Sequence, residues 1–264
     1  MKLIVRDVEF QYPSAYAIKD ISLKLSEYEI MGLVGPNGSG KSTLLKCICK
    51  ILSPQRGVIL LDGKDIEKLN RMEIARKVGY VPQSLLNSFP ATVFDTVLIG
   101  RRPHISWRTT DKDVEKVLEV LKTLNIENLA MRDINELSGG EKQKVFIART
   151  LVQEAEVLLL DEPTSNLDIK HQLEMMEIIK KLVKSAGLCA IIAMHDLNLA
   201  ARYSDKILMM KNGKVFSAGT PIEVLTPKNI EVVYEVKVEV WNLNGILHII
   251  PIAPIQQIDL LRGD

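Results

Sequence analysis

The sequence is poor in cysteine, in aromatic residues and in net charge. Its 264 residues include 3 cysteines and 5% aromatics, and 34 Lys and Arg balance 33 Asp and Glu. Cys47, Cys49 and Cys189 lie in apolar surroundings without histidines at ligand spacing, so we expect buried, reduced thiols of a cytosolic protein. The balanced charge gives no sign of steering toward nucleic acid or a membrane surface.

Long apolar runs are also missing. No uncharged apolar stretch reaches the roughly 18 residues that a membrane-crossing helix needs. The N-terminal MKLIVRDVEF is too polar for the core of a signal peptide. We therefore expect a soluble chain that meets a membrane only through partner proteins, long enough to bury a sizeable core as one large domain or a domain with an insert.

Short apolar runs and turn signals predict the strands. Residues 3–10 alternate loosely, as an antiparallel edge strand does, and Asn212-Gly213 is a strong hairpin signal. Helical spacing is seen over residues 44–52, and again over 169–185 up to a stop at Gly187. Further strands are expected at residues 30–34, 57–63, 157–160, 188–194, 207–210 and 215–218.

The middle of the chain has a different pattern. Residues 111–124 form an amphipathic helix, with Thr110 and Asp113 as a plausible capping box. We predict a core at residues 1–84 and 154–228, whose first part carries a β subdomain. A helical subdomain is predicted at 85–153 and an accessory β segment at 229–264.

A phosphate-binding loop follows the predicted strand at 30–34. GPNGSGKST at residues 35–43 fits G-x-x-x-x-G-K-[ST], and its position between a strand and a helix is the context that supports this motif. Lys41 should reach the β- and γ-phosphates and Ser42 should ligate Mg²⁺. Thr43 stands where a dinucleotide fingerprint needs its third glycine. The expected nucleotide-binding residues are Gly35, Pro36, Asn37, Gly38, Ser39, Gly40, Lys41, Ser42 and Thr43.

Two adjacent acids end the apolar strand at residues 157–160. Carboxylates at the end of a buried strand are costly unless they meet cations or polarise a reactant. Beside a phosphate loop, Asp161 would hold the Mg²⁺ shell and Glu162 would polarise the attacking water. Alone such a pair is equally typical of a surface turn, so its significance depends on the loop.

A third motif, LSGGEKQ at residues 137–143, resembles the signature of the ABC ATPase family. Its small hydroxyl and two glycines lead into a helix, as in a second anion site. The resemblance implies an α/β fold: a P-loop NTPase (RecA-like) core with an antiparallel β subdomain and an inserted α-helical subdomain. It also implies a head-to-tail homodimer, in which ATP and Mg²⁺ lie between the phosphate loop of one copy and Ser138, Gly139 and Gly140 of the other.

Other segments resemble the remaining motifs of this family, in order, over about residues 1–230. Gln83 matches the Q-loop, which contacts Mg²⁺ and water, and residues 165–168 resemble the D-loop that ends in Asp168. His195 matches the histidine that contacts the γ-phosphate. Tyr12 stands where an aromatic ring stacks on adenine, with Tyr16 as the alternative. The resemblance thus implies Glu162, His195 and Gln83 as catalytic residues and Ser42, Gln83 and Asp161 at the metal.

The stretch GRRPH at residues 100–104 resembles the ATPases of iron–siderophore, haem and cobalamin importers. That resemblance implies two transmembrane permease subunits, a substrate-binding protein in the complex, and a place at the cytoplasmic face of the cell membrane. Related subunits of molybdate transporters share these features, so the cargo stays open.

Two alternative functional classes are expected to have sequence features that differ from those of this chain. Soluble ABC ATPases of chromosomes or DNA repair carry a very long coiled coil between the phosphate loop and the signature, and no basic DNA-binding face is evident here. A non-hydrolysing regulatory binder would be expected to lose Glu162 or His195, and both are present.

Overall fold

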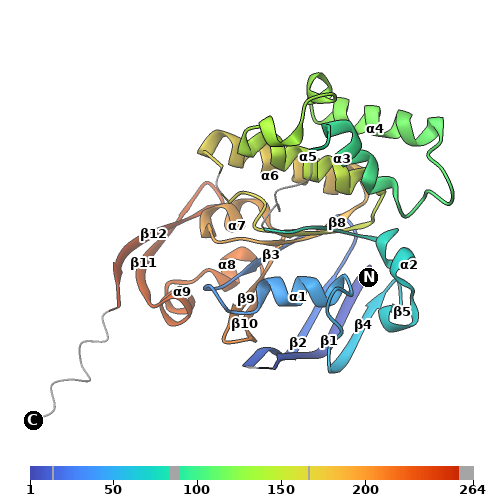
Figure 1. The fold of residues 1–264 in the computed structure, drawn as a ribbon. Helices are drawn as coiled ribbons and strands as arrows, with labels where there is room; N and C mark the ends of the chain where they lie inside the picture. Colours follow the sequence, from blue (N-terminus) through green and yellow to red (C-terminus); the bar gives the residue numbers. More distant parts are fainter. Residues whose placement is uncertain (14, 84–89, 166, 256–264) are drawn as a thin grey trace, which may run out of the picture.

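The computed structural model describes residues 1–13, 15–83, 90–165 and 167–255. Within these ranges the strands form a six-stranded sheet, a four-stranded sheet and a hairpin (Figure 1). The strands of the six-stranded sheet, in spatial order, are β10 (Lys214–Gly219), β9 (Lys206–Lys211), β3 (Ile30–Val34), β8 (Cys189–Ala193), β7 (Val157–Asp161) and β6 (Val78–Val81).

Five of these strands run parallel, and β10 pairs antiparallel with β9 through the predicted hairpin turn. Asn212 has a φ of 50° and Gly213 a φ of 75°. Positive φ at both central positions is what a type I′ turn requires, and Asn-Gly adopts it at little cost. This turn lies against the phosphate loop, because the N–H of Gly213 donates to the carbonyl of Ser39 at 3.2 Å.

The six-stranded sheet is buried on both faces. Along β7, Leu158 and Leu160 belong to one hydrophobic core and Val157 and Leu159 to the other. A strand with two buried faces needs apolar residues at every position, which explains the continuous apolar runs that predicted these strands.

One face of this sheet is covered by α1 (Lys41–Ile48) and the four-stranded sheet. Leu44 and Leu45 of α1 share a core with the inward residues of that sheet, among them Val5. The strands of the four-stranded sheet, in spatial order, are β2 (Ala15–Leu25), β1 (Leu3–Tyr12), β4 (Arg56–Leu61) and β5 (Lys64–Asp65).

The prediction of an edge strand at residues 3–10 is wrong. β1 lies between β2 and β4 and pairs antiparallel with both. Its alternation reflects one face in the core and one toward solvent, with Leu3 0% and Val5 1% exposed. Alternation records burial of side chains, and an internal strand of a one-sided antiparallel sheet shows it as clearly as an edge strand does.

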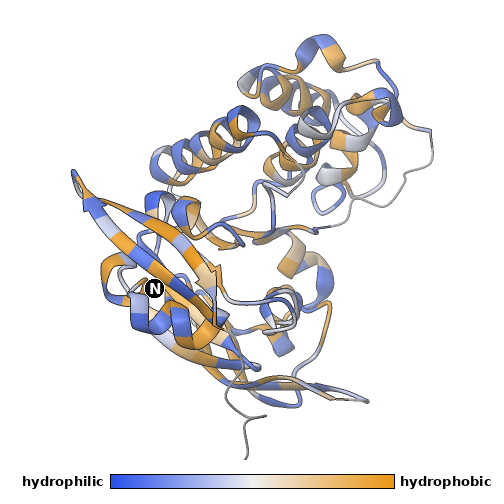
Figure 2. Cartoon of the chain, turned by 90° about the vertical axis from the view of Figure 1, so that its left-hand side faces the viewer, coloured by the Kyte–Doolittle hydropathy of each residue, from blue (hydrophilic) through white to orange (hydrophobic). Residues whose placement is uncertain are grey.

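The other face carries helices, which lie above the sheet in Figure 1. α6 (Ile169–Ala186) ends at Gly187, whose φ of 72° confirms the predicted stop. In Figure 2 the helices carry both hydrophobic and hydrophilic residues, as elements with one buried side do. The remaining helices of this layer are α3 (Val93–Leu98), α4 (Asp111–Thr123), α5 (Gly139–Leu151) and α7 (Leu197–Tyr203).

Short helical segments complete the connections. They are α2 (Arg71–Ala75) and the 3-10 turns η1 (Ile66–Lys68), η2 (Ile99–Arg101), η3 (Glu127–Leu129) and η4 (Ile134–Glu136). None of the helices within the described ranges combines the length and apolarity that crossing a membrane requires. The expected start of the helical subdomain, between residues 84 and 85, lies outside the described residues.

The expected β segment at residues 229–264 begins in a helix and not in a strand. α8 (Pro221–Val224) and α9 (Pro227–Tyr234) precede the hairpin of β11 (Val236–Leu243) and β12 (Ile246–Pro254). α9 forms because Thr226 caps it, accepting from the N–H of Asn229 at 3.2 Å, and proline is favoured at the first helical position. Residues 256–264 of the expected segment lie outside the described residues.

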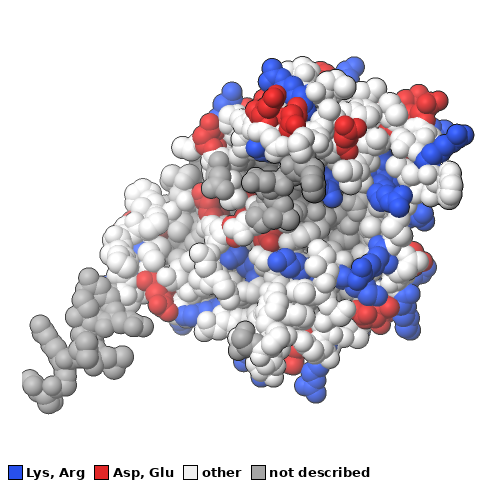
Figure 3. All heavy atoms as spheres, in the orientation of Figure 1, with Lys and Arg blue, Asp and Glu red and all other residues white. Residues whose placement is uncertain are grey.

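The three cysteines are unpaired, as predicted. Cys47 and Cys189 are buried and Cys49 is half-buried. Burial raises the pKa of Cys47 and of Cys189 to about 12, so both remain protonated and unreactive near neutral pH. Surface charges of both signs are interspersed on the face shown in Figure 3, consistent with the near-zero net charge.

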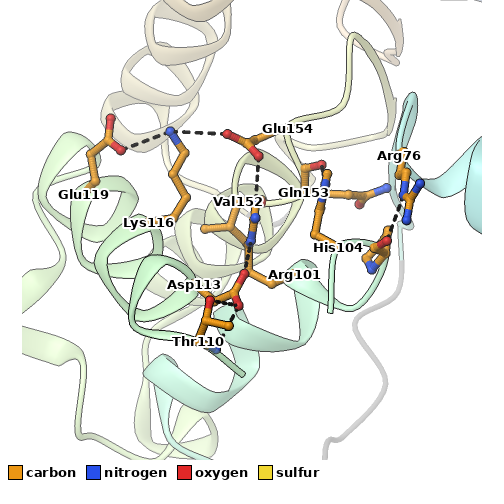
Figure 4. A network of polar contacts seen from close by, with 11 residues as sticks. Arg76, Arg101, His104, Thr110, Asp113, Lys116, Glu119, Val152, Gln153 and Glu154 are labelled. Carbon is orange, nitrogen blue, oxygen red and sulfur yellow. Dashed lines mark hydrogen bonds and ion pairs between the residues drawn. The ribbon is translucent and has the colours of Figure 1, made fainter. Parts of the chain in front are cut away.

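The GRRPH stretch is a structural junction of the helical layer. The buried Arg101 guanidinium donates to Asp113 at 3.0 Å, to the carbonyl of Val152 at 2.8 Å and to Glu154 at 2.6 Å. It thereby joins the start of α4 to the end of α5 (Figure 4). The predicted capping box is confirmed at the same place, since Asp113 also accepts from Thr110.

The next residues of that stretch reach the core. The ring of His104 contacts the carbonyl of Gln153 at 2.8 Å, and Arg76, at the end of α2, donates to the carbonyl of Pro103 at 2.9 Å (Figure 4). Gln153 in turn donates to the carbonyl of Val78 at 2.9 Å. These contacts connect the helical layer to the start of β6.

Replacing Arg101 by Met is expected to lower the free energy of unfolding by about 3 kcal/mol, because it leaves the buried Asp113 without its cation. Urea denaturation measures this. The exposed neighbour provides the control: Arg102→Met removes the same charge and should change stability by less than about 0.5 kcal/mol. Equal losses for the two variants would contradict the assigned role of Arg101.

Candidate active site

The phosphate loop lies between the end of β3 and the start of α1. Glycine is required here for space as well as conformation. A Cβ on Gly40, which has a φ of 100°, would lie 2.5 Å from the carbonyl oxygen of Ala17, and one on Gly35 would lie 2.3 Å from that of Met210. The backbone of the loop is therefore packed tightly between β2 and β9, where a side chain at either glycine would collide with a backbone carbonyl.

Lys41, the first residue of α1, is buried at this loop. Its ammonium donates to the carbonyls of Gly35 at 2.8 Å and Pro36 at 3.1 Å. Burial lowers the pKa of Lys41, while the nearby carboxylates of Glu162 and Asp161 oppose that shift. An ammonium held by neutral carbonyls can exchange them for phosphate oxygens at a gain in Coulomb energy.

A cavity of about 520 Å³ opens over the loop. Ten of the predicted site residues line it, together with Tyr16, the alternative to Tyr12, and with Ala15 and Ala17 of β2, which were not predicted as contacts. Both Tyr12 and Tyr16 are on the wall, so the choice between them as an adenine platform stays a prediction. The predicted residues on the wall are Tyr12, Asn37, Gly38, Ser39, Gly40, Lys41, Ser42, Thr43, Gln83 and Glu162.

Asp161, at the end of β7, contacts the last part of the phosphate-loop motif. Its Oδ1 accepts from the hydroxyl of Ser42 at 3.0 Å and its Oδ2 from the hydroxyl of Tyr80 at 3.2 Å. Burial raises the pKa of Asp161, and the adjacent Glu162 adds to the rise, while the two hydroxyl donors oppose it. Tyr80, on β6, was missed by the sequence analysis.

Glu162 brings together three segments that are distant in the chain. Its Oε2 accepts from Nε2 of Gln83 at 2.5 Å, and its Oε1 contacts Nε2 of His195. These residues follow β7, β6 and β8, whose carboxyl ends lie side by side in the sheet. Glu162 is 9% exposed and has a φ of 54°, a conformation that non-glycine residues rarely adopt. Gln83 and Glu162 line the cavity, and the imidazole of His195 contacts the Glu162 carboxylate.

The residues present fit a magnesium ion that arrives with a nucleotide. Mg²⁺ prefers oxygen ligands, and in nucleotide sites it takes one or two from the protein and the rest from phosphates and water. Ser42 and Asp161 supply such oxygens within hydrogen-bond distance of each other. Among the described residues no group of three or more His, Cys, Asp or Glu could hold a metal unaided.

The signature residues lie elsewhere on the chain. Ser138 caps α5 and forms a capping box with Glu141, and none of Ser138, Gly139 and Gly140 is among the residues that line the cavity. Glu141 Oε2 accepts from the Ser138 hydroxyl at 2.7 Å. The pKa of Glu141 is lowered by these hydrogen bonds. The predicted second anion site is therefore a capped helix N-terminus that lies apart from the cavity.

Asp168, the aspartate of the predicted D-loop, is linked to the predicted second site through His171. Asp168 caps α6 by accepting from the N–H of His171 at 2.8 Å and from its ring at 2.7 Å. The His171 ring packs on the signature, since a Cβ on Gly140 would lie 3.3 Å from its Cδ2. The sequence analysis gave His171 no role. Asn166, also part of the expected D-loop, lies outside the described residues.

Comparison with known proteins shows the family. The sequence model of the ABC transporter family matches residues 18–165. The chain is 52% identical to an uncharacterized ABC transporter ATP-binding protein of Methanocaldococcus jannaschii, over 96% of this chain and 99% of that protein. It is 38% identical to the petrobactin import ATP-binding protein of Bacillus anthracis, over 90% and 88%.

Solved structures give the same result. A protein described as a metal-chelate type ABC transporter in an inward-facing conformation aligns with a TM-score of 0.83 at 27% identity, over 97% of this chain and 98% of that one. A dimeric ATP-binding cassette bound to ADP and phosphate aligns with a TM-score of 0.74 at 30% identity, over 83% and 98%. The predicted fold is confirmed. The chain belongs to the ABC transporter family and is an ATP-binding, ATP-hydrolysing subunit of that family.

Proposed function

We propose that this chain is the ATPase of an importer for a metal chelate of the iron–siderophore, haem or cobalamin kind. The observation that supports the ATPase part is that Glu162, on the wall of the cavity above the phosphate loop, contacts both Gln83 and His195. The cargo part is supported by the relative that imports petrobactin and by the structural match to a metal-chelate type transporter.

Two copies of the chain would bind head to tail. One chain carries two helix N-termini suited to phosphate, and only the one at Lys41 opens into the cavity. Dimerisation would place Ser138, Gly139 and Gly140 of one copy on the γ-phosphate held by the other, with Asp168 beside that contact. The similar cassette whose structure is dimeric supports this arrangement.

In each nucleotide site, which both copies would form, the side chains would have different roles. The loop amides and Lys41 bind the phosphates, and Mg²⁺, held through Ser42, Asp161 and Gln83, would neutralise charge on them. Glu162 orients the attacking water as general base, and its contacts with Gln83 and His195 hold the carboxylate toward the cavity. Oxyanion charge would then be stabilised by preorganised donors from both copies.

Closure of the dimer would drive a movement of the membrane partners. The helical layer, joined to β6 through Gln153, would move with nucleotide state and contact two transmembrane permease subunits. A substrate-binding protein would deliver cargo on the other side. With these partners the chain would lie at the cytoplasmic face of the cell membrane, and no step calls for nucleic acid. Because the cargo does not touch this subunit, a molybdate transporter remains the alternative, ahead of a non-transport ABC ATPase.

Uptake in cells tests the cargo. Cells that lack the chain are expected to lose accumulation of a radiolabelled iron–siderophore or cobalamin, because transport requires turnover by this subunit. The wild-type chain should restore it and a Glu162→Gln chain should not. Radiolabelled molybdate serves as the comparison: restoration of molybdate uptake alone would transfer the assignment to that class.

A further inference from the structure

The carboxylate of Asp161 has a hydroxyl partner on each oxygen. Ser42 of α1 donates to Oδ1 at 3.0 Å, and Tyr80 of β6 donates to Oδ2 at 3.2 Å. Asp161 is 2% exposed, so water has little access to either oxygen. A buried carboxylate with two protein donors has its orientation set by them.

Tyr80 is well placed to fix that orientation. It lies on the strand that pairs with β7, next to Leu159 in the register, and its ring packs on the core shared with α1. Tyr80 also lines a second cavity, of about 410 Å³, together with Cys49 and Gln153. The ring is therefore held by packing at one end and its hydroxyl by Asp161 at the other.

From this geometry we infer that Tyr80 is a positioning residue for the metal site. By occupying Oδ2 it keeps Oδ1 turned toward Ser42, so that the hydroxyl and the carboxylate are presented together when MgATP binds. The inference rests on the proposed role of Ser42 and Asp161 at the metal. Tyr80 itself touches neither nucleotide nor metal in this account.

If Tyr80 had a purely structural role, its replacement would change different measured properties. Removing a hydroxyl that only supports the fold lowers stability and affects all ligands alike, whereas removing one that orients a metal-site carboxylate weakens the metal selectively. Partners that orient the groups at a metal typically change its affinity by about 10- to 100-fold when removed.

Tyr80→Phe in the full chain tests the inference. The probe is Mn²⁺ in the presence of ADP, with free Mn²⁺ followed by its electron paramagnetic resonance signal. Mn²⁺ affinity is expected to fall about tenfold, while ADP affinity measured in excess EDTA stays unchanged. The matched control is Tyr203→Phe, which removes an equivalent hydroxyl, 2.9 Å from Glu177 and on α7, and should leave both values unchanged.

The possible outcomes distinguish the inference on Tyr80 from the proposed metal site. Wild-type Mn²⁺ affinity in Tyr80→Phe would overturn the inference and leave the proposed function standing. If the wild-type chain binds ADP but no Mn²⁺ with it, the metal site itself is wrong. A double-mutant cycle with Asp161→Asn adds a second measurement: Tyr80→Phe should have little further effect when the carboxylate is gone, and additive losses would overturn the inference. Tyr80→Phe keeps the packed ring, so the variant is expected to fold as the wild type does.

Discussion

Replacing Glu162 by Gln is expected to lower the ATP turnover rate by roughly 10²- to 10⁴-fold, the usual contribution of a general base. The amide keeps the shape of the side chain but cannot accept a proton from water. Because neither Lys41 nor the loop is altered, ATP affinity should stay within about twofold of wild type. Phosphate release and equilibrium nucleotide binding, measured on the same preparation, give the two values.

A surface carboxylate provides the control for that experiment. Glu119 on α4 is exposed and pairs only with Lys116 among the contacts found for its side chain in the described residues. Glu119→Gln makes the same chemical change and should leave turnover unaffected. Normal hydrolysis by Glu162→Gln would show that another group activates water and would remove the catalytic assignment.

Replacing Lys41 by Ala has its main effect on binding. The buried ammonium is the one side-chain cation among the residues that line the cavity, and charge-assisted hydrogen bonds to phosphate contribute about 1.5–3 kcal/mol each. ATP affinity should therefore fall about 10- to 100-fold. Titration with a fluorescent ATP analogue measures the change.

Lys64→Ala, which removes an exposed ammonium on β5, is the control for the Lys41 experiment. That variant should bind ATP as the wild type does. Unchanged affinity in Lys41→Ala would mean that the amides of the loop hold the phosphates without help, and the expected exchange of Gly35 and Pro36 carbonyls for phosphate oxygens would be wrong.

The parts of the site that could be predicted from sequence are those with fixed local spacing. A phosphate loop needs glycines at set positions between a strand and a helix, so residues 35–43 were identified directly, and the structure adds why Gly40 cannot carry a side chain. The hairpin turn at Asn212-Gly213, the end of α6 at Gly187 and the capping of α4 are equally local and were predicted correctly.

What could not be predicted depends on which strands become neighbours. Tyr80 contacts Asp161 across 81 positions of sequence, and no local pattern records that pairing of β6 with β7. The position of β1 inside its sheet, and the packing of His171 on the signature, likewise arise only once distant segments meet. The helix α9 was missed for a different reason: its Thr226-Pro227 start signal was present but was outweighed by the alternation that follows.

The central claim is that one nucleotide is bound between two copies of the chain. The mass of Glu162→Gln in solution, measured by light scattering with Mg²⁺ and ATP and again without nucleotide, tests it most directly. The account predicts a dimer with ATP and a monomer without it, and a return to monomer when Ser138→Arg is added to obstruct the signature. A protein that stays monomeric with saturating Mg²⁺ and ATP would contradict the account.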